Sequence, residues 1–501
     1  MELQGKLQSY VTRTSEELGI TPIRAIRLIY SAKRLSDRTK GDFSVFITGP
    51  RSDELQAFIP RMIADLPRLS ESWPLQISVV EYRAESPYVD LILERPSAFH
   101  YLCRRVARIH LRIEKLLKDP PASGKRLVFV RSPRENDFDG KRSLLLVNYM
   151  RRVCQFNGIE TTFEEPEWSD VSCDSGQEEF ETNSCYEQSC EGVDLAKFVK
   201  IRGLSEKFHP SVGLVLKNSP AFKFAQAIRR RIHLGPGDLL CHVAPHSKSS
   251  NQQKVGLLLM VLGFEAKQSF LFHGGAQGGN SSIESHEHRI GSQISHQLRQ
   301  KRIHGTEAVG EVLKDTKIAF DFLSVKQASR VKLPDNPPDS DPGSFGDRGG
   351  LFVQYTCSRL TGILKKYDRL ISQRVYPGCL SSDELCAENM DTTHLSSDQE
   401  WSLWRSMLRF VDLLESSSNT SLPLYDLDPF PRIDAGAHTA CESLLFLCKE
   451  FSAFYSRVRI LVESQAHVLR TVECRIYFVG MLLKLIKAGL WLMGLEAVEY
   501  M

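Results

Sequence analysis

Hydrophobic residues in the first 120 positions follow two different periods. A spacing of three to four residues predicts helices over residues 10–34 and 97–117, and alternation predicts strands over residues 43–48, 77–82 and 88–94. Helices and strands are mixed here, so we predict a small α+β domain over residues 1–120.

The middle section repeats a different order of elements, in which a buried strand precedes a helix. Predicted strands cover residues 126–130, 212–216, 239–242 and 270–272, and predicted helices cover residues 143–157, 220–232 and 253–262. Gly158 and Gly263 end two of these helices, and the glycine-rich segment 274–282 is expected to be a loop. This order predicts an α/β domain over residues 125–335.

The last section has helical periodicity only. Candidate helices cover residues 352–366, 397–415, 435–461 and 466–493. A segment rich in proline and glycine, 334–350, separates them from the α/β section and reads as a linker. We therefore predict a helical bundle over residues 350–501.

Charge is distributed unevenly over the 501 residues, although the net charge is only +3. Residues 1–162 hold 27 Lys and Arg against 19 Asp and Glu, whereas residues 163–195 hold 11 acidic residues and no Lys or Arg. Two basic bodies around an acidic strip are compatible with a nucleic-acid partner. The strip at 164–194 has few core-forming residues and is predicted to be a disordered insert; an electrostatic decoy for the basic surface is the alternative.

A stripe of arginines follows the predicted helix 97–117. Arg104, Arg105, Arg108 and Arg112 share its polar face. The stripe fits either a solvated helix surface or a surface that faces phosphates, and the sequence leaves both open.

Other patterns argue against several classes of site. The twelve cysteines form no C-x-x-C pair, which indicates free thiols in a reducing compartment, and no metal or other cofactor is expected. His242 and His246 are interpreted as loop histidines because Pro245 opposes a helix. The segment 1–19 has no apolar core of a secretory signal, and Lys484 and Lys487 interrupt the most apolar stretch, so we predict a cytoplasmic protein without a membrane span.

Three segments of the last section resemble the DALR anticodon-binding domain of arginyl-tRNA synthetases. The opening helix of that family reads F-x-Q-Y-x-x-x-R-x-x-x-I-L, and here its positions are Phe352, Gln354, Tyr355, Arg359, Ile363 and Leu364. Residues 450–461 resemble the family's F-N-x-F-Y segment, and residues 488–501 resemble its terminal G-L-x-L-L-G-x-x-x-x-E-R-M.

A weaker resemblance to the same synthetases extends upstream, without their ATP-binding motifs. Residues 128–133 resemble the strand V-x-F-S-S-P, and Lys141-Arg142-Ser143 resembles the L-R-S that follows, but the histidines of the family's H-x-G-H are absent. Glu135, Asp137 and Asp139 crowd the same loop, where carboxylates repel a phosphate. No K-M-S-K-S-like lysine follows residues 270–272, so the resemblance implies a degenerate class I synthetase-like Rossmann-type domain that forms no adenylate.

The resemblance also implies which residues contact tRNA. Tyr355 and Arg359 lie one helical turn apart with Gln354 beside them, a combination suited to stacking a base and holding its phosphate. Tyr500 and Met501 correspond to the family's terminus, which closes onto the anticodon site, while Phe454 and Tyr455 are interpreted as core. Residues 1–120 loosely resemble the domain that contacts the tRNA elbow, and within them Arg104 and Arg108 are the candidate phosphate contacts.

The function implied is that of a non-catalytic adaptor. It would bind arginine tRNAs through the DALR domain and present them to a tRNA 3-methylcytidine methyltransferase that modifies the anticodon loop. A divergent arginyl-tRNA synthetase-like enzyme and a purely structural subunit of a complex are the alternatives.

Overall fold

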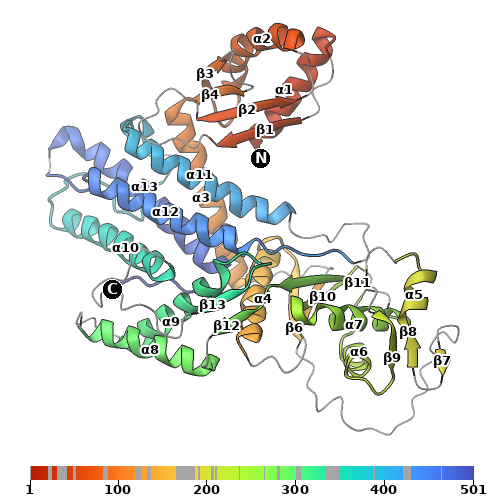
Figure 1. Ribbon diagram of the computed structural model, residues 1–501. Coiled ribbons are helices and arrows are strands. Elements are labelled where there is room, and N and C mark those ends of the chain that lie inside the picture. The colour runs from red at the N-terminus through yellow and green to blue at the C-terminus, as the bar shows by residue number, and fades with distance from the viewer. Residues whose placement is uncertain are drawn as a thin grey trace.

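The computed structural model describes most of the chain, in separate ranges. These are residues 2–20, 25–30, 42–48, 52–82, 88–119, 126–131, 137–164, 187–189, 192–204, 208, 212–235, 237–264, 266–278, 282–300, 306–333, 349–386, 390–420, 430–463 and 465–500. Met501, the linker residues 334–348 and most of the acidic insert lie outside these ranges. Figure 1 shows an N-terminal α+β part, an α/β body and a group of long C-terminal helices.

The N-terminal part is an antiparallel sheet covered by two helices. Its strands follow the order β1-β2-β4-β3. The elements are α1 (Glu2–Leu18), β1 (Ala25–Tyr30), β2 (Phe43–Thr48), α2 (Ser52–Ser70), β3 (Ile77–Tyr82) and β4 (Tyr88–Leu93). The helix predicted over 10–34 was wrong: α1 ends at Leu18, Gly19 follows with φ 63°, and residues 25–30 pair with β2. Strand pairing there outweighs the local helical spacing.

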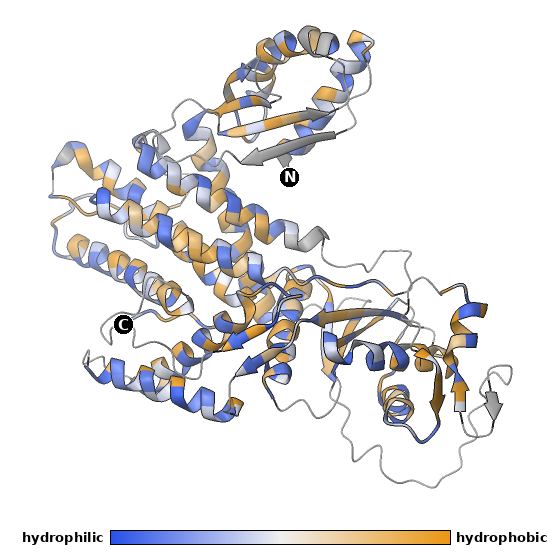
Figure 2. Ribbon diagram, viewed as in Figure 1, coloured by the Kyte–Doolittle hydropathy of each residue, from blue (hydrophilic) through white to orange (hydrophobic). Residues whose placement is uncertain are grey.

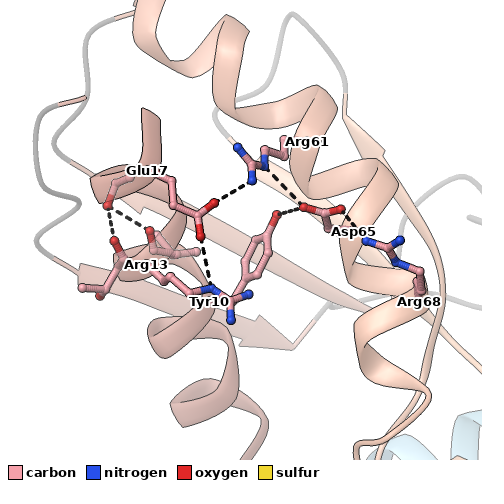
Figure 3. Close-up of polar contacts among 9 residues, drawn as sticks. Tyr10, Arg13, Glu17, Arg61, Asp65 and Arg68 are labelled. Carbon is pink, nitrogen blue, oxygen red and sulfur yellow. Dashed lines mark hydrogen bonds and ion pairs between the residues drawn. The ribbon is translucent and has the colours of Figure 1, made fainter. Parts of the chain in front are cut away.

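A polar network fastens α1 to α2. Arg61 of α2 donates to Glu17 of α1 at 2.6 Å, and the Tyr10 hydroxyl lies 3.5 Å from Asp65. Figure 3 shows these side chains converging between the two helices, with Arg13 and Arg68 at the edges. Since Arg61 and Glu17 are each more than 40% exposed, the network fixes orientation more than it adds stability.

The α/β body contains a parallel sheet of order β11-β10-β5-β6, which confirms the Rossmann-type prediction. Its elements are β5 (Arg126–Arg131), α4 (Phe138–Phe156), β6 (Glu160–Glu164), β10 (Leu239–Pro245), α7 (Ser249–Val261) and β11 (Lys267–His273). Helix α4 links β5 to β6, and α7 links β10 to β11. The connections therefore lead to opposite edges of the sheet from the neighbouring strands β5 and β10. In sheets of this kind ligands bind at the carboxyl ends of the strands at such a point.

Smaller elements complete this body. They are α5 (Leu195–Ile201), α6 (Pro220–Arg231) and a small antiparallel sheet of β7 (Glu187–Ser189), β8 (Gly192–Asp194) and β9 (Leu214–Leu216). The insert predicted to be disordered over 164–194 therefore ends in two strands, and residues 165–186 lie outside the described ranges. The expected loop at 274–282 contains β12 (Ala276–Gly278), which pairs with β13 (Val331–Leu333).

The predicted helical bundle is confirmed, with helices α10 (Gly350–Ser372), α11 (Asp398–Thr420), α12 (Ala437–Arg457) and α13 (Ala466–Leu492). Helices α8 (Ile283–Gln300) and α9 (Thr306–Leu323) connect it to the α/β body, and α9 packs against α10. Figure 2 colours the central helices of the bundle mostly as hydrophobic and α8 mostly as hydrophilic. Gly489 of α13 permits close packing, because a Cβ there would lie 2.9 Å from the Phe410 ring.

Helix α3 (Arg95–Lys118) packs in the bundle, although its sequence lies in the first section. It contacts α11 and α13, and Figure 1 shows it among the C-terminal helices. The Trp404 indole donates to the Ala98 carbonyl at 2.8 Å, and the Trp401 indole donates to Asp42 at 2.7 Å. These contacts fix the N-terminal part to the helical bundle. No helix within the described ranges combines the length and apolar character needed to cross a bilayer.

Candidate nucleic-acid interface

The side chains of Tyr355 and Arg359 form one aromatic–cationic surface on α10. Tyr355 is 40% exposed, and the Arg359 guanidinium lies 5.9 Å from its ring centroid. The ring centroid of Tyr455 of α12 lies 4.0 Å from the same guanidinium. Arg359 therefore lies within cation–π distance of two rings, which attract and orient its guanidinium.

Tyr455 extends this surface beyond the sequence-based expectation, which placed it with Phe454 in the core. Phe454 is buried at 2% exposure, whereas Tyr455 is half-buried and faces Arg359. No sequence signal links α12 to α10 at this point, because the pairing depends on how the two helices cross.

Gln354 does not belong to the surface. It was expected beside Tyr355, but it is 0% exposed. Its amide donates to the Thr316 hydroxyl at 2.9 Å and to the Glu496 carbonyl at 2.7 Å, and its oxygen accepts from the Val498 amide at 2.8 Å. One residue of helix turns a side chain by about 100°, so the neighbour of an exposed Tyr355 points into the core. Gln354 positions the C-terminal residues instead of contacting RNA.

The C-terminal residues are held against α10 and α13. Lys487 donates to Glu499 at 2.7 Å, and this contact lowers the pKa of the Glu499 carboxyl. Val498 is buried, while Tyr500 is 59% exposed. Tyr500 therefore has an accessible ring next to the anchored residues Val498 and Glu499, and its contact with tRNA stays a prediction; Met501 lies outside the described residues.

Arg104 and Arg108 are exposed on α3, at the positions expected for phosphate contacts. Arg105, expected on the same stripe, is only 4% exposed. It bonds Asp412 and Glu415 of α11, both at 2.5 Å, and therefore acts as a packing residue between helices. Arg104 and Arg108 lie on a different helix from Tyr355, but α13 packs against both α3 and α10.

Residues at the carboxyl edge of the parallel sheet are engaged with one another. Arg142 of α4 is 1% exposed and donates to the carbonyls of Gly275, Ser329 and Lys326 at 2.7, 2.6 and 3.0 Å. Burial lowers the pKa of Arg142 to about 10, while Asp139 opposes that shift. The sequence placed Arg142 in a motif but did not predict its bonds to carbonyls, because these partners lie more than 130 residues away along the chain.

The N-terminus of α4 is closed by its own carboxylates. Asp137 caps the helix and accepts from the Gly140 amide at 3.0 Å, so α4 begins five residues before the predicted residue 143. Asp139 accepts from the Ala276 amide at 2.6 Å, which ties β12 to this helix end. The Asp137 carboxylate thus occupies one of the N–H donors that attract phosphate at a helix N-terminus, and Asp139 adds a second negative charge there.

Two buried histidines lie on the strands next to this edge. His273 lies 2.9 Å from the Ser143 hydroxyl and accepts from the Gly275 amide, so its Nε2 carries the proton. His242 was expected in a loop, but it is a fully buried residue of β10 held between Gln252 and Gln268. Within the described ranges, no group of three acidic, histidine or cysteine side chains is arranged to hold a metal ion.

Comparison with known proteins places these features in a family context. The family model of the DALR anticodon binding domain matches residues 353–501. DALR anticodon-binding domain-containing protein 3 from Danio rerio is 29% identical over 208 residues, 41% of this chain and 34% of that protein. The protein of the same name from Rattus norvegicus is 26% identical over 191 residues, 38% of this chain and 33% of that protein. The matched region thus spans about a third of the length of these curated relatives.

Two solved structures share the fold over nearly the whole chain. The arginyl-tRNA synthetase of Thermus thermophilus has a TM-score of 0.56 at 15% identity and covers 100% of both chains. The enzyme from Plasmodium falciparum has a TM-score of 0.61 at 12% identity and covers 100% of this chain and 99% of its own. The chain therefore has an arginyl-tRNA synthetase-like fold, and its residues 353–501 match the family model of the DALR anticodon binding domain.

Proposed function

We propose that this protein is a non-catalytic tRNA-binding adaptor that recognises arginine tRNAs. The observation that carries the proposal is the Tyr355–Arg359–Tyr455 cluster, with its exposed Tyr355 ring, within a segment that matches the anticodon-binding domain model. Unpaired anticodon bases are recognised by stacking on aromatic rings and by charged contacts to their phosphates. Exposed Tyr355 and Tyr500 supply rings, and Arg359 supplies a cation.

We expect Tyr355→Ala to weaken tRNA binding by about 1–3 kcal/mol, the scale of one lost base stack. Binding is measured by filter retention of a labelled arginine tRNA at fixed salt. Tyr355→Phe is the matched control, because it keeps the ring over Arg359 and should retain most of the affinity. Equal affinity of Tyr355→Ala and the native protein would remove this residue from the interface.

The arginine specificity is tested by sequencing the RNA that copurifies with the intact protein. Enrichment of arginine tRNAs over other tRNAs supports the proposal. Equal recovery of all tRNAs would contradict the proposed specificity for arginine tRNAs. A third outcome, protein partners that persist after ribonuclease with no tRNA bound, would favour a structural subunit.

We further propose that the α/β body forms no aminoacyl adenylate. The proposal is supported by the carboxylates of Asp137 and Asp139 at the N-terminus of α4 and by Arg142, whose guanidinium is bonded to backbone carbonyls. A divergent synthetase would need other groups to stabilise charge on the ATP phosphates. We expect no arginine-dependent exchange of pyrophosphate into ATP, with or without tRNA, and any such turnover would overturn this part.

The destination of the bound tRNA is proposed to be a tRNA 3-methylcytidine methyltransferase. A reader of the anticodon side that leaves the tRNA chemically unchanged is suited to present the anticodon loop to another enzyme. Reconstitution tests this: 3-methylcytidine on arginine tRNA should rise when the protein is added to the methyltransferase. An increase of the same size with Tyr355→Ala would show that tRNA presentation is not the cause.

A further inference from the structure

Arginines and aromatic rings from three helices form a continuous band outside the Tyr355 surface. The Arg112 guanidinium of α3 lies 4.6 Å from the Phe156 ring centroid of α4. Phe156 is 6.4 Å from the Trp491 ring of α13, and the Arg152 guanidinium lies 5.1 Å from that same ring. We call these four residues, with Arg104 and Arg108, the arginine–aromatic band.

The α3 part of the band is a row of evenly spaced charges. Arg104, Arg108 and Arg112 lie four residues apart, so they share one helix face with a rise of about 6 Å between neighbours. All three are exposed. Arg105, between them in the sequence, points to α11 instead and pairs with Asp412 and Glu415.

Among the described residues, no ion pair joins an acidic side chain to Arg104, Arg108, Arg112 or Arg152. Burial lowers the pKa of Arg152, and the charge of the adjacent Arg151 lowers it further. Cations gathered without counter-charges form a local positive potential that attracts a polyanion.

The rings in the band hold the arginines and leave little room for bases. Phe156 is only 5% exposed, and Trp491 is half-buried beneath Arg152. A guanidinium that stacks by its face keeps its N–H edges free to bind phosphate in a bidentate manner. The band is thus suited to the sugar-phosphate backbone of a paired helix, whereas the exposed Tyr355 ring is suited to an unpaired base.

A short segment of the chain connects the band to the anticodon-side surface. Trp491 lies in the last turn of α13, and at Gly494 a Cβ would lie 4.0 Å from Asn148 of α4. Two residues further, Gln354 of α10 bonds the Glu496 carbonyl beside Tyr355. One segment of the chain therefore runs from the band to the residues proposed to read the loop.

We propose that the arginine–aromatic band binds the backbone of a double-stranded arm, outside the anticodon stem, of the same tRNA whose anticodon loop contacts Tyr355. This inference rests on the proposed function. Contacts to backbone phosphates do not depend on the base sequence, so the band adds affinity for every tRNA. The Tyr355 surface then supplies the discrimination between tRNAs. Two linked contacts on one rigid RNA strengthen binding more than either alone.

The test compares an intact arginine tRNA with its isolated anticodon stem-loop, using the full-length protein. For Arg108→Gln/Arg112→Gln/Arg152→Gln we expect intact tRNA to bind about 10- to 100-fold more weakly, with the slope of log affinity against log salt reduced by about 3. Stem-loop affinity should change less than about twofold. Lys200→Gln/Lys223→Gln/Lys267→Gln, exposed lysines of the α/β body, is the control for loss of three charges.

The outcomes separate this inference from the proposed function. If the native protein binds neither RNA, the proposed function fails and the inference fails with it. If it binds both and the triple variant binds intact tRNA normally, or if the lysine control loses as much affinity, only the band is overturned. Arg104→Gln/Arg108→Gln alters only exposed side chains and serves as a second variant in case the triple variant misfolds. A several-fold loss of affinity for intact tRNA, with an unchanged circular dichroism spectrum, would support the band independently of the triple variant.

Discussion

Replacing Arg142 by Met should release the segment that closes the carboxyl edge of the parallel sheet. Its guanidinium satisfies the carbonyls of Gly275, Ser329 and Lys326, and Met keeps much of the volume without a donor. The Gly275 and Lys326 carbonyls keep their bonds from the Val331 and Ser329 amides, whereas the Ser329 carbonyl loses the bond from Arg142. Each hydrogen bond to a charged group contributes about 1.5–3 kcal/mol. We expect a loss of about 3 kcal/mol in the free energy that keeps this segment closed.

Amide hydrogen exchange measures this loss where it occurs. The Gly274 amide donates to the Gln327 carbonyl and the Val331 amide to the Gly275 carbonyl, so peptides covering both residues should exchange about 100-fold faster. Peptides from β3 and β4 serve as the internal control. Arg142→Lys keeps the charge with fewer donors, so its exchange rate in these peptides should lie between those of the native protein and Arg142→Met. Unchanged exchange at Gly274 would mean that Arg142 does not close this edge.

Mild acid should destabilise the α/β body through His242 and His273. Burial lowers the pKa of His242 to about 4, although the hydrogen bond to the Gln268 side-chain oxygen raises it. Burial, with the charges of Arg142 and His246, lowers the pKa of His273 to about 3. Both rings are 0% exposed and neutral in the fold. A group whose folded pKa is depressed keeps its full stabilisation above the unfolded value near 6.5 and loses it as the pH falls.

The size of this effect follows from the pKa differences. At pH 5 each histidine lies about 1.5 pH units below its unfolded pKa and still above its folded one, so each removes about 2 kcal/mol. We expect the free energy of unfolding of the α/β body to drop by about 4 kcal/mol between pH 7 and pH 5 from these two groups. Urea unfolding, read by exchange labelling of peptides from β10 and β11, measures it.

Variants distinguish this cause from general acid sensitivity. His273→Asn removes one of the two buried imidazoles and should reduce the drop by about half, whatever its own stability at pH 7. His288→Gln removes an exposed histidine of α8 and should leave the drop unchanged. The same pH dependence in His273→Asn and the native protein would contradict the assignment.

The linear pattern determined where the long elements and the motifs lie. Hydrophobic spacing predicted α10 to α13 and the strands β2, β3, β5, β10 and β11 to within a few residues, because each buries a face that its own sequence must supply. The DALR-like motifs are local as well, since Tyr355 and Arg359 are one turn apart on one helix. That residues 132–142 contain no histidine could also be read directly, since it concerns which residues are present.

Only the tertiary structure decided which of these side chains face solvent and which contact each other. Gln354 and Arg105 appear as surface residues by type, yet each is buried because distant groups satisfy its polar atoms: Glu496 and Val498 for Gln354, Asp412 and Glu415 for Arg105. The pairing of β12 with β13 likewise depends on residues more than 50 positions apart. Periodicity describes one element at a time, whereas burial and hydrogen bonding depend on the partner that folding brings to it.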